Sequence, residues 1–522
     1  MIQQISKIRI GTRTSLMAMA QAKKVAARLQ AQNPGLVCEM VGITPSGDKD
    51  KKTPLWQMDV VGIFSHELDE RLLAQDVDCV VHSFKDLGTE RPKGIKMAAL
   101  LPRDNPRDII LFNPNIEEKL KKGEEICIGT SSPRRMVQVP DFLSQALPQV
   151  GPSPRICTAV LRGNANSRIE KLKNPQEGAQ KYDGIVLALA GLTRLLEDDA
   201  ATAVTQQLLS GLKVMVLPLT QCPTAPGQGL VCVEVREGDE AMQSLMAPLH
   251  CRQTESQVQA EREILLRHGG GCHQRFGATQ LHLPNLTNPV MLVRGENKDE
   301  ERVDEDIWQA PDITVQAGTV WDGQSQGENL FIAQPVQADI PEAPVMFVTH
   351  ARAMPEGFMP ASRLWVSGVQ TWFKLAKRGL WVEGCGEGFG IDFLKNTLAE
   401  PVLSLPPLAT WKVLTHAGAV GHWPKGQAIA TYQLTLNAQS PLLEDLSRAT
   451  TAWWGSGTQY EYLGEQATHV TLHACGAGRT ADTLRARGLN PVVFPSHSIF
   501  LKWLQDKAVH PQKTQELKAS VQ

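Results

Sequence analysis

Residues 124–135, EEICIGTSSPRR, join a strand to the start of a helix. The apolar run ICIG is typical of a buried strand. Ser132 followed by Pro133 predicts a helix that begins there, because serine is a favoured N-cap and proline a favoured first helical residue. The same alternation of short apolar runs and helical patterns continues through the first 235 residues. This pattern predicts an α/β fold with mostly parallel or mixed sheets.

The composition is that of an ordinary globular protein, since 42% of the 522 residues are hydrophobic and 21% are charged. A chain of this length is too long for one core, and roughly three to four domains are expected. The net charge of −2 gives no overall field for nucleic acid or an anionic membrane, so we expect neither partner.

The sequence has no apolar segment typical of a signal peptide and no run of about 18 apolar residues, so we expect a cytoplasmic protein without a transmembrane helix. The ten cysteines show neither a CxxC pair nor the Cys/His spacing of a zinc site. We therefore expect free thiols and no metal.

Arginines gather just after predicted strands and at predicted helix starts, which is the edge where open α/β sheets bind ligands. Arginine binds carboxylates through two hydrogen bonds, and helix N-termini add N–H donors for anions. The set therefore predicts a substrate with several carboxylates, although each member alone would be an ordinary surface charge. The members are Arg13, Arg134, Arg135, Arg162, Arg168 and Arg194.

Lys85 and Asp86 follow the apolar run VDCVV (77–81), so we expect both at the end of a strand. A carboxylate there can stabilise a developing cation, and a lysine can bind an acid group of the substrate. The alternative is an ion pair in a solvated loop.

Cys272 lies in RHGGGCHQRFG (267–277), directly after three glycines and close to Arg267 and His268. Glycines allow an accessible turn, and cationic neighbours favour the thiolate. This setting predicts a thiol that can form a covalent bond to a substrate or cofactor, while a buried, inert cysteine is the alternative.

Eight motifs occur in the order found in hydroxymethylbilane synthases, also called porphobilinogen deaminases. They are RIGTRTS (9–15), HSFKD (82–86), RDNPRD (103–108), GTSSPRR (129–135), LRGNANSR (161–168), YDGIVLALAGLTRL (182–195), APGQG (225–229) and GGGC (269–272). The chain resembles this family over roughly residues 7–300. The resemblance implies two α/β lobes like those of periplasmic binding proteins, formed by 1–105 with 214–237 and by 106–213. A small α+β domain, 238–338, follows.

The resemblance also implies the activity and the site. A dipyrromethane cofactor, made from two porphobilinogens, would be linked to Cys272, and four more porphobilinogens would be added with loss of ammonia. Asp86 matches the catalytic carboxylate. The resemblance implies a monomer. It places Lys85, Ser132, Arg134, Arg135, Arg162 and Gln228 on the cofactor, and Arg13, Ser15, Arg168 and Arg194 on the substrate.

Three segments depart from the family pattern. The active-site loop has VVGIF (60–64), with Val61 where lysine is usual. TPSGD (44–48) lacks a usual arginine, and HQRFG follows the cysteine. We expect an active but divergent enzyme; weakened activity, or a cytosolic protein that only binds small carboxylates, is the alternative.

From Pro341 onward short motifs recur, which predicts a module of two similar α/β units; chance similarity among glycine-rich turns is the alternative. The pairs are VMFVTH (345–350) with WKVLTH (411–416), LWVSG (364–368) with AWWGSG (452–457), and GCGEG (384–388) with ACGAG (474–478).

This module, 341–510, resembles uroporphyrinogen III synthase. The resemblance suggests ligand contacts at Ser367, Ser456, Thr458 and the turn 476–480, because glycine-rich turns that lead into helices bind acidic groups. Tyr432 falls near a position where that family can place a tyrosine. A non-catalytic module that only receives the product is the alternative.

Overall fold

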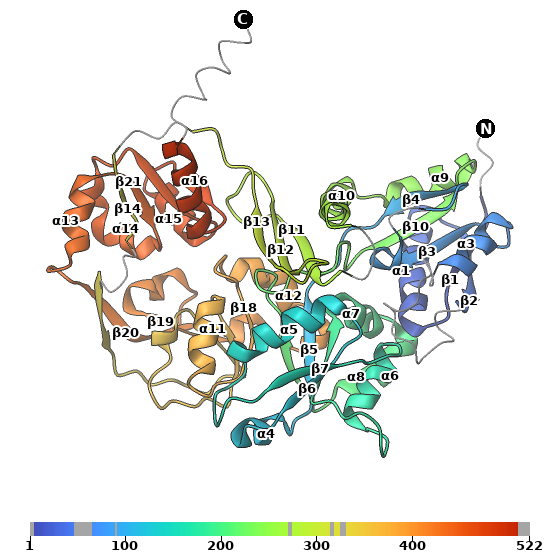
Figure 1. Cartoon of the computed structure of the whole chain (residues 1–522), viewed down its shortest axis with the longest axis horizontal. Coiled ribbons are helices and arrows are strands. Elements are labelled where there is room, and N and C mark those ends of the chain that lie inside the picture. Colours follow the sequence, from blue (N-terminus) through green and yellow to red (C-terminus); the bar gives the residue numbers. More distant parts are fainter. Residues whose placement is uncertain are drawn as a thin grey trace, which may run out of the picture.

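The computed structural model describes residues 5–45, 65–88, 91–269, 274–313, 318–323 and 330–509. Within these residues the strands form five sheets covered by helices, so the predicted mixed α/β fold is confirmed (Figure 1). None of the helices in this part of the chain is both long and apolar enough to cross a membrane.

Lobe 1 is built on a five-stranded sheet of order β2-β1-β3-β10-β4. β1 is parallel to β2 and β3, whereas β10 is antiparallel to β3 and β4. Its elements are β1 (Lys7–Arg13), α1 (Leu16–Gln32), β2 (Val37–Ile43), α3 (His66–Leu73), β3 (Cys79–Ser83), β4 (Ile95–Leu100) and β10 (Val231–Arg236).

Lobe 2 has a five-stranded sheet of order β7-β6-β8-β5-β9, in which β5 is the antiparallel strand. Its strands are β5 (Asp108–Phe112), β6 (Ile126–Gly129), β7 (Ile156–Ala159), β8 (Gly184–Ala188) and β9 (Lys213–Val216). Its helices are α4 (Ile116–Lys122), α5 (Pro133–Ala146), α6 (Ala165–Lys173), α7 (Leu189–Glu197) and α8 (Asp199–Leu209).

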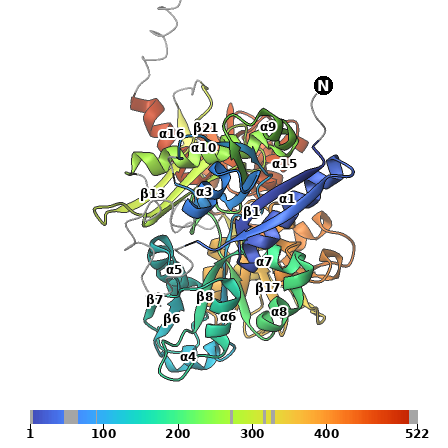
Figure 2. The same ribbon diagram turned by 90° about the vertical axis from the view of Figure 1, so that its right-hand side faces the viewer.

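The two lobes share one plan, because the antiparallel strand has the same place in both sheets. In each lobe that strand is the one that arrives from the other lobe: β5 follows the first crossing of the chain, and β10 follows the second. This plan agrees with the expected periplasmic-binding-protein-like lobes. We call residues 101–107 the first crossing segment and residues 217–230 the second. Figures 1 and 2 show lobe 1 above lobe 2, and the helices α1 and α7 also touch each other between the two lobes.

A third unit lies beside the crossing segments. The helix α10 (Arg252–Arg267) packs on an antiparallel sheet of β11 (Phe276–Leu281), β12 (Val290–Glu296) and β13 (Arg302–Ile307). The preceding helix α9 (Glu240–Met246) packs on β4 of lobe 1. The helix α10 and this sheet form a small α+β unit, whereas Met242 and Met246 of α9 lie in the core of lobe 1; the small α+β domain expected over 238–338 stays a prediction.

The C-terminal module contains two sheets, and we name its two halves module lobe A and module lobe B. Lobe A has the order β15-β20-β19-β16-β17-β18, parallel except for β15. Its elements are β15 (Phe331–Pro335), β16 (Val345–Val348), β17 (Arg363–Val366), α11 (Val369–Ala376), β18 (Val382–Cys385), α12 (Lys395–Leu398), β19 (Lys412–His416) and β20 (Ala428–Leu436).

Module lobe B is a parallel sheet of order β14-β21-β22-β23 with helices around it. Its strands are β14 (Thr319–Trp321), β21 (Ala449–Trp454), β22 (Leu472–Gly476) and β23 (Val492–Phe494). Its helices are α13 (Pro441–Arg448), α14 (Gly457–Leu463), α15 (Arg479–Ala486) and α16 (His497–Val509). Thus β14 and β15, which precede Pro341, pair with strands of the module, while the expected domain limits stay predictions.

One of the recurring motif pairs does not mark two separate units. VMFVTH and WKVLTH form β16 and β19, which are hydrogen-bonded neighbours in lobe A rather than the first strands of two separate units. The other two pairs do lie in different sheets, because β17 and β18 belong to lobe A and β21 and β22 to lobe B.

The module and lobe 2 share their hydrophobic core. Trp372 on α11 is fully buried, and its ring meets Phe142 on α5 edge to face at 5.2 Å. Its indole N–H donates to the carbonyl oxygen of Ala146 at 3.1 Å. The same cluster joins Phe112 of β5 to Val382 of β18. Figure 1 shows α11 beside α5 accordingly.

Candidate active site

The cysteine expected to carry the cofactor, Cys272, lies outside the described residues, as do Val61 and the TPSGD segment from Ser46 onward. The described residues on either side of the cysteine lie close together, since the rings of His268 and Phe276 are 4.8 Å apart. The departures from the family pattern at these places therefore stay predictions.

Asp86 lies at the carboxyl end of β3, in the short 3-10 turn Phe84–Asp86. Phe84 fixes this turn, because its ring is buried and the guanidinium of Arg262 lies 4.0 Å from the ring centre. The half-buried carboxylate of Asp86 is 3.8 Å from Nη1 of Arg13, which ends the neighbouring parallel strand β1. The two side chains thus share the ligand-binding edge of the lobe 1 sheet.

Lys85 occupies an environment that disfavours its positive charge. Burial lowers its pKa to about 8; Arg135 acts in the same direction, and Asp86 opposes them. A lysine whose charge the protein compensates this poorly is a good binding site for a carboxylate ligand.

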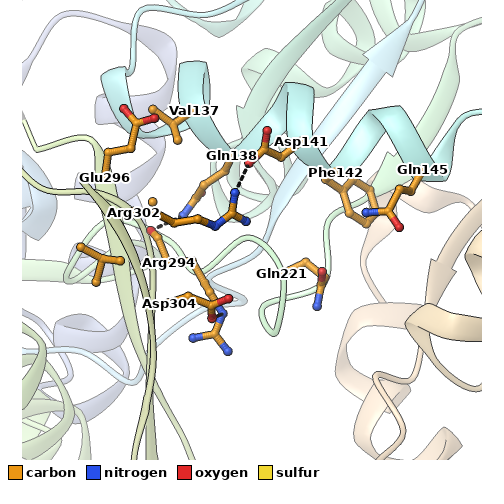
Figure 3. A pocket seen from close by; sticks show the side chains of 12 residues that line it. Val137, Gln138, Asp141, Phe142, Gln145, Gln221, Arg294, Glu296, Arg302 and Asp304 are labelled. Carbon is orange, nitrogen blue, oxygen red and sulfur yellow. Dashed lines mark hydrogen bonds and ion pairs between the residues drawn. The ribbon is translucent and has the colours of Figure 1, made fainter. Parts of the chain in front are cut away.

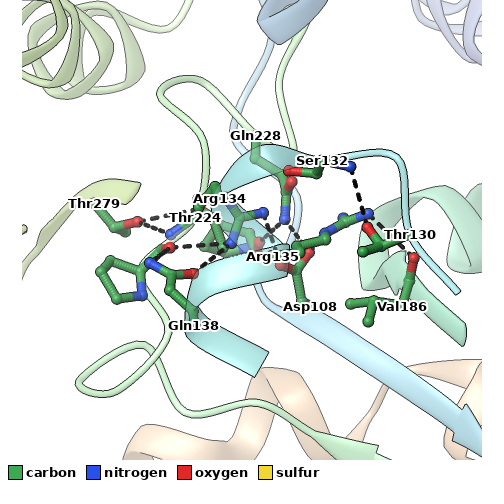
Figure 4. Close-up of polar contacts among 12 residues, drawn as sticks. Asp108, Thr130, Ser132, Arg134, Arg135, Gln138, Val186, Thr224, Gln228 and Thr279 are labelled. Atoms are coloured by element: carbon green, nitrogen blue, oxygen red, sulfur yellow. Dashed lines mark hydrogen bonds and ion pairs between the residues drawn. The ribbon is translucent and has the colours of Figure 1, made fainter. Parts of the chain in front are cut away.

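Asp108, the first residue of β5, binds two arginines from the first turn of α5 (Figure 4). Its Oδ1 lies 2.7 Å from Nη2 of Arg135, and its Oδ2 lies 2.8 Å from Nη2 of Arg134. All three side chains are buried. Although burial acts in the opposite direction, the two guanidinium groups hold the pKa of Asp108 well below its usual range.

Gln228 supports this cluster from the second crossing segment. Its Nε2 donates to Oδ1 of Asp108 at 2.7 Å and to the carbonyl oxygen of Pro106 at 2.6 Å. The side chain is buried, so it orients Asp108 and ties the two crossing segments together. In this structure Gln228 acts on the predicted site through Asp108.

Arg162 and Arg168 lie on lobe 2 near the same edge. Burial lowers the pKa of Arg168 to about 10; Arg135 and Arg162 act in the same direction, and Asp86 opposes them. Asp86 belongs to lobe 1, so its electrostatic influence on Arg168 reaches from one lobe to the other. The Nε of Arg168 donates to the carbonyl oxygen of Gly163 at 2.7 Å.

The two predicted serines occupy the N-cap positions of helices. The hydroxyl of Ser15 accepts from the N–H of Ala18 at 3.3 Å and so begins α1. Ser132 is the N-cap residue of α5, as the sequence predicted, but its hydroxyl makes no capping hydrogen bond. Its N–H donates to Oγ1 of Thr130 at 3.2 Å.

Arg194 differs from the other predicted arginines because it forms hydrogen bonds with both crossing segments. Its Nε donates to Oδ2 of Asp104 at 2.8 Å, and its Nη2 donates to the carbonyl oxygen of Gly229 at 2.7 Å. Only 5% of the residue is exposed. Arg194 thus holds the two segments together, and its predicted contact with substrate stays a prediction.

Sequence reasoning missed Asp108, which organises the arginine pair. The motif RDNPRD ends on this residue, and a carboxylate at the start of an apolar strand was the available signal.

A cavity of about 270 Å³ lies on another side of α5, between that helix and β12 and β13 of the third unit (Figure 3). Arg302 and Asp141 form an ion pair across it at 3.0 Å. Among the predicted site residues that the structure describes, none lines this cavity.

A family model described as porphobilinogen deaminase, dipyrromethane cofactor binding domain, matches residues 8–244. The porphobilinogen deaminase of Syntrophus aciditrophicus is 38% identical over 266 residues, which cover 51% of this chain and 78% of that protein. The chain belongs to the porphobilinogen deaminase family. The deaminase of Desulforamulus reducens is 33% identical over 55% of this chain and 82% of its own length, and that of Dictyostelium discoideum is 34% identical over 54% and 80%.

Membership in the porphobilinogen deaminase family confirms the predicted resemblance and the dipyrromethane cofactor. Among solved structures, YhfZ from Shigella flexneri aligns with a TM-score of 0.24 at 12% identity, over 50% of this chain and 97% of that one. The likeness of the C-terminal module to uroporphyrinogen III synthase stays a prediction.

Proposed function

We propose that the protein is a hydroxymethylbilane synthase that adds four porphobilinogen units, one at a time, to a dipyrromethane primer bound through Cys272. Family membership supports porphobilinogen as the substrate and tetrapyrrole biosynthesis as the process. The observation that carries the proposal is the place of Asp86 at the carboxyl end of β3, with its carboxylate 3.8 Å from Nη1 of Arg13; its influence on the pKa of Arg168 on lobe 2 agrees with this place. One carboxylate thus faces a set of cations at the edge where ligands bind.

The described residues fit a cofactor with several carboxylates. Lys85 and Arg168 both have lowered pKa values because burial penalises their charges, so a negatively charged ligand supplies the missing compensation. When bound, dipyrromethane supplies the pyrrole carbon that is extended. Lys85, Arg134, Arg135 and Arg162 are the cations that would hold its carboxylates, with Arg13 and Arg168 on those of the substrate.

Asp86 has the chemistry that each addition needs. Porphobilinogen becomes cationic as it loses ammonia, and the ring carbon that forms the new bond must then lose a proton. A carboxylate beside the pyrrole nitrogens stabilises both cationic states and can carry that proton. The half-buried position of Asp86 restricts water around it, which strengthens this electrostatic effect.

The test is Asp86→Asn, which keeps the shape and removes the charge. We expect turnover of porphobilinogen to fall by roughly 10²-fold or more, because this is the scale of acid–base and charge stabilisation by one group. Intact-mass measurement should still show the added dipyrromethane on the variant, since the cations that hold it are unchanged.

Asp78→Asn is the matched control. Asp78 directly precedes β3 while Asp86 lies just after it, so the two carboxylates occupy opposite ends of one strand; Asp78 binds Arg9 at 2.8 Å. Its variant should turn over normally. Normal turnover by Asp86→Asn would contradict the proposed role. An unmodified mass of the wild-type chain, purified from cells that make porphobilinogen, would instead favour a small-carboxylate binding protein.

A second activity, uroporphyrinogen III synthase, is favoured by one feature of the C-terminal module. The carboxyl ends of the parallel strands in its two sheets lie against each other: Nε2 of His416, which ends β19, is 3.4 Å from Oγ1 of Thr458, which follows β21. Gly478 beside β22 lies against Gly388 beside β18. Such edges bind ligands in α/β proteins.

The predicted ligand residues of the module belong to these two edges. Ser367 follows β17, Ser456 follows β21, and the turn 476–480 follows β22. Tyr432 is buried, with its ring 5.8 Å from that of His416. The isomer of the product decides between the two readings: type III uroporphyrinogen from the full chain supports a synthase, and only type I contradicts it.

A further inference from the structure

The glycine-rich turn after β18, residues 386–388, contacts the two crossing segments. Its N–H groups are bonded inside lobe A, from Gly386 to the carbonyl of Val366 and from Gly388 to the carbonyl of Ser367, both at 2.9 Å. Between them Glu387 adopts φ = +55°, a left-handed conformation that is unfavourable for most residues other than glycine or asparagine. Such backbone strain persists only where surrounding contacts hold the residue.

The contacts that hold Glu387 come from both crossing segments. Its Oε1 lies 2.6 Å from Nη2 of Arg107 in the first segment. Its Oε2 accepts from the N–H of Thr220 in the second segment at 2.7 Å. The carboxylate is completely buried. One side chain of the C-terminal module therefore joins the two stretches of chain that connect lobe 1 to lobe 2.

Other residues of module lobe A surround the same point. Oγ1 of Thr397 lies 3.2 Å from Nη1 of Arg107 and accepts from Asn105 at 2.9 Å. The guanidinium of Arg107 also lies 5.2 Å from the ring centre of Phe393. Thr193, beside Arg194, donates a hydrogen bond to Glu400. The module thus contacts the first crossing segment and α7 together.

The joined segments carry residues that shape the arginine cluster. Asp108 directly follows Arg107, and its carbonyl accepts from the N–H of Leu217 at 2.9 Å. Gln228, in the second segment, binds Asp108. Two-lobed proteins open and close through small changes in such connecting segments. A contact that fixes both segments therefore sets how lobe 1, with Asp86, faces lobe 2.

We propose that Glu387 is a positioning residue for the deaminase reaction: it locks the two crossing segments in the orientation that places Asp86 opposite the lobe 2 arginines. The proposal rests on the proposed function of the first part of the chain. The C-terminal module then serves the deaminase directly, whatever chemistry it performs itself. The loss of activity when Glu387 is replaced should grow as the bound pyrrole chain lengthens, because each added unit must still be bound between the two lobes.

The test compares Glu387→Gln with Glu383→Gln in the full-length chain. Glutamine at 387 can still accept from Thr220 but leaves Arg107 without its counter-charge. Glu383 is a matched control: it lies on β18, just before the turn that holds Glu387, is buried, and forms an ion pair with Arg363 inside module lobe A, 2.8 Å from Nε to Oε1. Each variant removes one buried charge, from β18 itself or from the turn directly after it.

Three readouts separate positioning from stability. For Glu387→Gln we expect kcat/KM for porphobilinogen to fall about tenfold, since small misplacements at a hinge cost this much or more. Intact masses after limited substrate should show stalled, partly extended chains. Hydrogen exchange should rise in both crossing segments. Glu383→Gln should lower the melting temperature without any of these three changes.

The outcomes are distinct for the two proposals. If the wild-type chain carries the primer and turns over, but Glu387→Gln matches it in kcat/KM, stalled masses and exchange, the positioning role is overturned alone. Equal losses in Glu383→Gln also overturn it, because they would show a general effect of stability. A wild-type chain with no primer mass and no turnover overturns the proposed function, and this role with it.

Discussion

At the scale of single residues, Asp108 is the group on which the arginine pair depends. It is fully buried between Arg134 and Arg135, so Asp108→Asn leaves two buried cations without their counter-charge. We expect the free energy of unfolding to fall by about 3–5 kcal/mol, the usual cost of breaking a buried pair on one side. Primer occupancy, measured by intact mass, should fall with it, because the arginines lose their fixed geometry.

Asp141→Asn is a suitable control for that substitution. Asp141 also pairs with an arginine, Arg302, but 56% and 72% of the two side chains are exposed. Solvent screens such a pair, so its loss should cost less than about 1 kcal/mol and leave the primer in place. Equal effects of the two substitutions in a urea titration would contradict the role given to Asp108.

His82 gives the protein a specific dependence on pH. It is buried beside Glu234, 3.4 Å from Nε2, but Arg91 already binds that carboxylate at 2.7 Å. Burial therefore dominates and lowers the pKa of His82 from its ordinary 6.5 to about 4. Between these values the unfolded chain binds a proton that the folded chain does not. The free energy of unfolding therefore decreases as the pH is lowered through this window, by about 3 kcal/mol in all.

His82→Gln isolates this contribution. Burial also raises the pKa of nearby Asp69, which acts in the opposite direction where it titrates, but that group is present in both proteins. We expect the wild-type chain to lose more stability than the variant between pH 6.5 and 4, as measured by urea unfolding at each pH. Parallel curves for the two proteins would show that His82 does not titrate as proposed.

At the scale of elements, local signals predicted where strands and helices begin, but not which sheet a strand joins. Ser132 with Pro133 marked the start of α5, and VDCVV marked β3. The likeness of 345–350 to 411–416 reflects similar parallel strands, and only packing places both in one sheet.

The candidate site shows the same division between local and long-range information. Motifs identified Asp86 and the arginines, because these residues follow strands or begin helices. The partners of those residues come from far along the chain: Gln228 reaches Asp108, and Glu387 reaches Arg107. The local sequence around Glu387, a glutamate in a glycine-rich turn, is typical of an exposed loop. Its burial depends on the docking of a whole module, which spacing along the chain does not reveal.

The helix α11 provides a test of that docking. Trp372→Ala removes a fully buried ring and its hydrogen bond to Ala146, where the module meets α5. Truncating a buried aromatic residue costs about 3–5 kcal/mol, and we expect this loss in thermal or urea unfolding. Trp503→Ala on α16 is the control. It also removes a buried tryptophan, but its cluster belongs to module lobe B and the segment before it. If Trp372→Ala and Trp503→Ala lowered the stability of lobe 2 equally, this would contradict the shared interface.

At the scale of the whole molecule, the hydrophobic clusters do not follow the order of the chain. Among the described residues, the main core of lobe 1, with Cys79 in it, includes residues of α9 but none of lobe 2 or of the module. Lobe 2 shares clusters with module lobe A, including Cys222 and Cys385, which are far apart in sequence. The third unit shares a cluster with module lobe B, through residues such as Leu292 and Trp454. The units that should unfold together are therefore defined by these cores rather than by the two family resemblances.

Buried thiols make this arrangement measurable. Burial raises the pKa of Cys79, Cys222 and Cys385, so all three react slowly with a thiol reagent until the surrounding structure opens. In a urea titration with labelling detected by peptide mass, we expect Cys222 and Cys385 to become reactive at one midpoint, because they lie in one cluster. Cys79 should follow its own midpoint.

Trp372→Ala sharpens the prediction, since it weakens the cluster that holds Cys222 and Cys385. Both midpoints should move to lower urea by the same amount, while that of Cys79 moves less. Separate midpoints for Cys222 and Cys385 in the wild-type chain would show that lobe 2 and the module unfold independently. In that case the module could leave the crossing segments while the deaminase lobes stay folded. A common midpoint instead means that Glu387 stays in contact with the crossing segments as long as lobe 2 is folded.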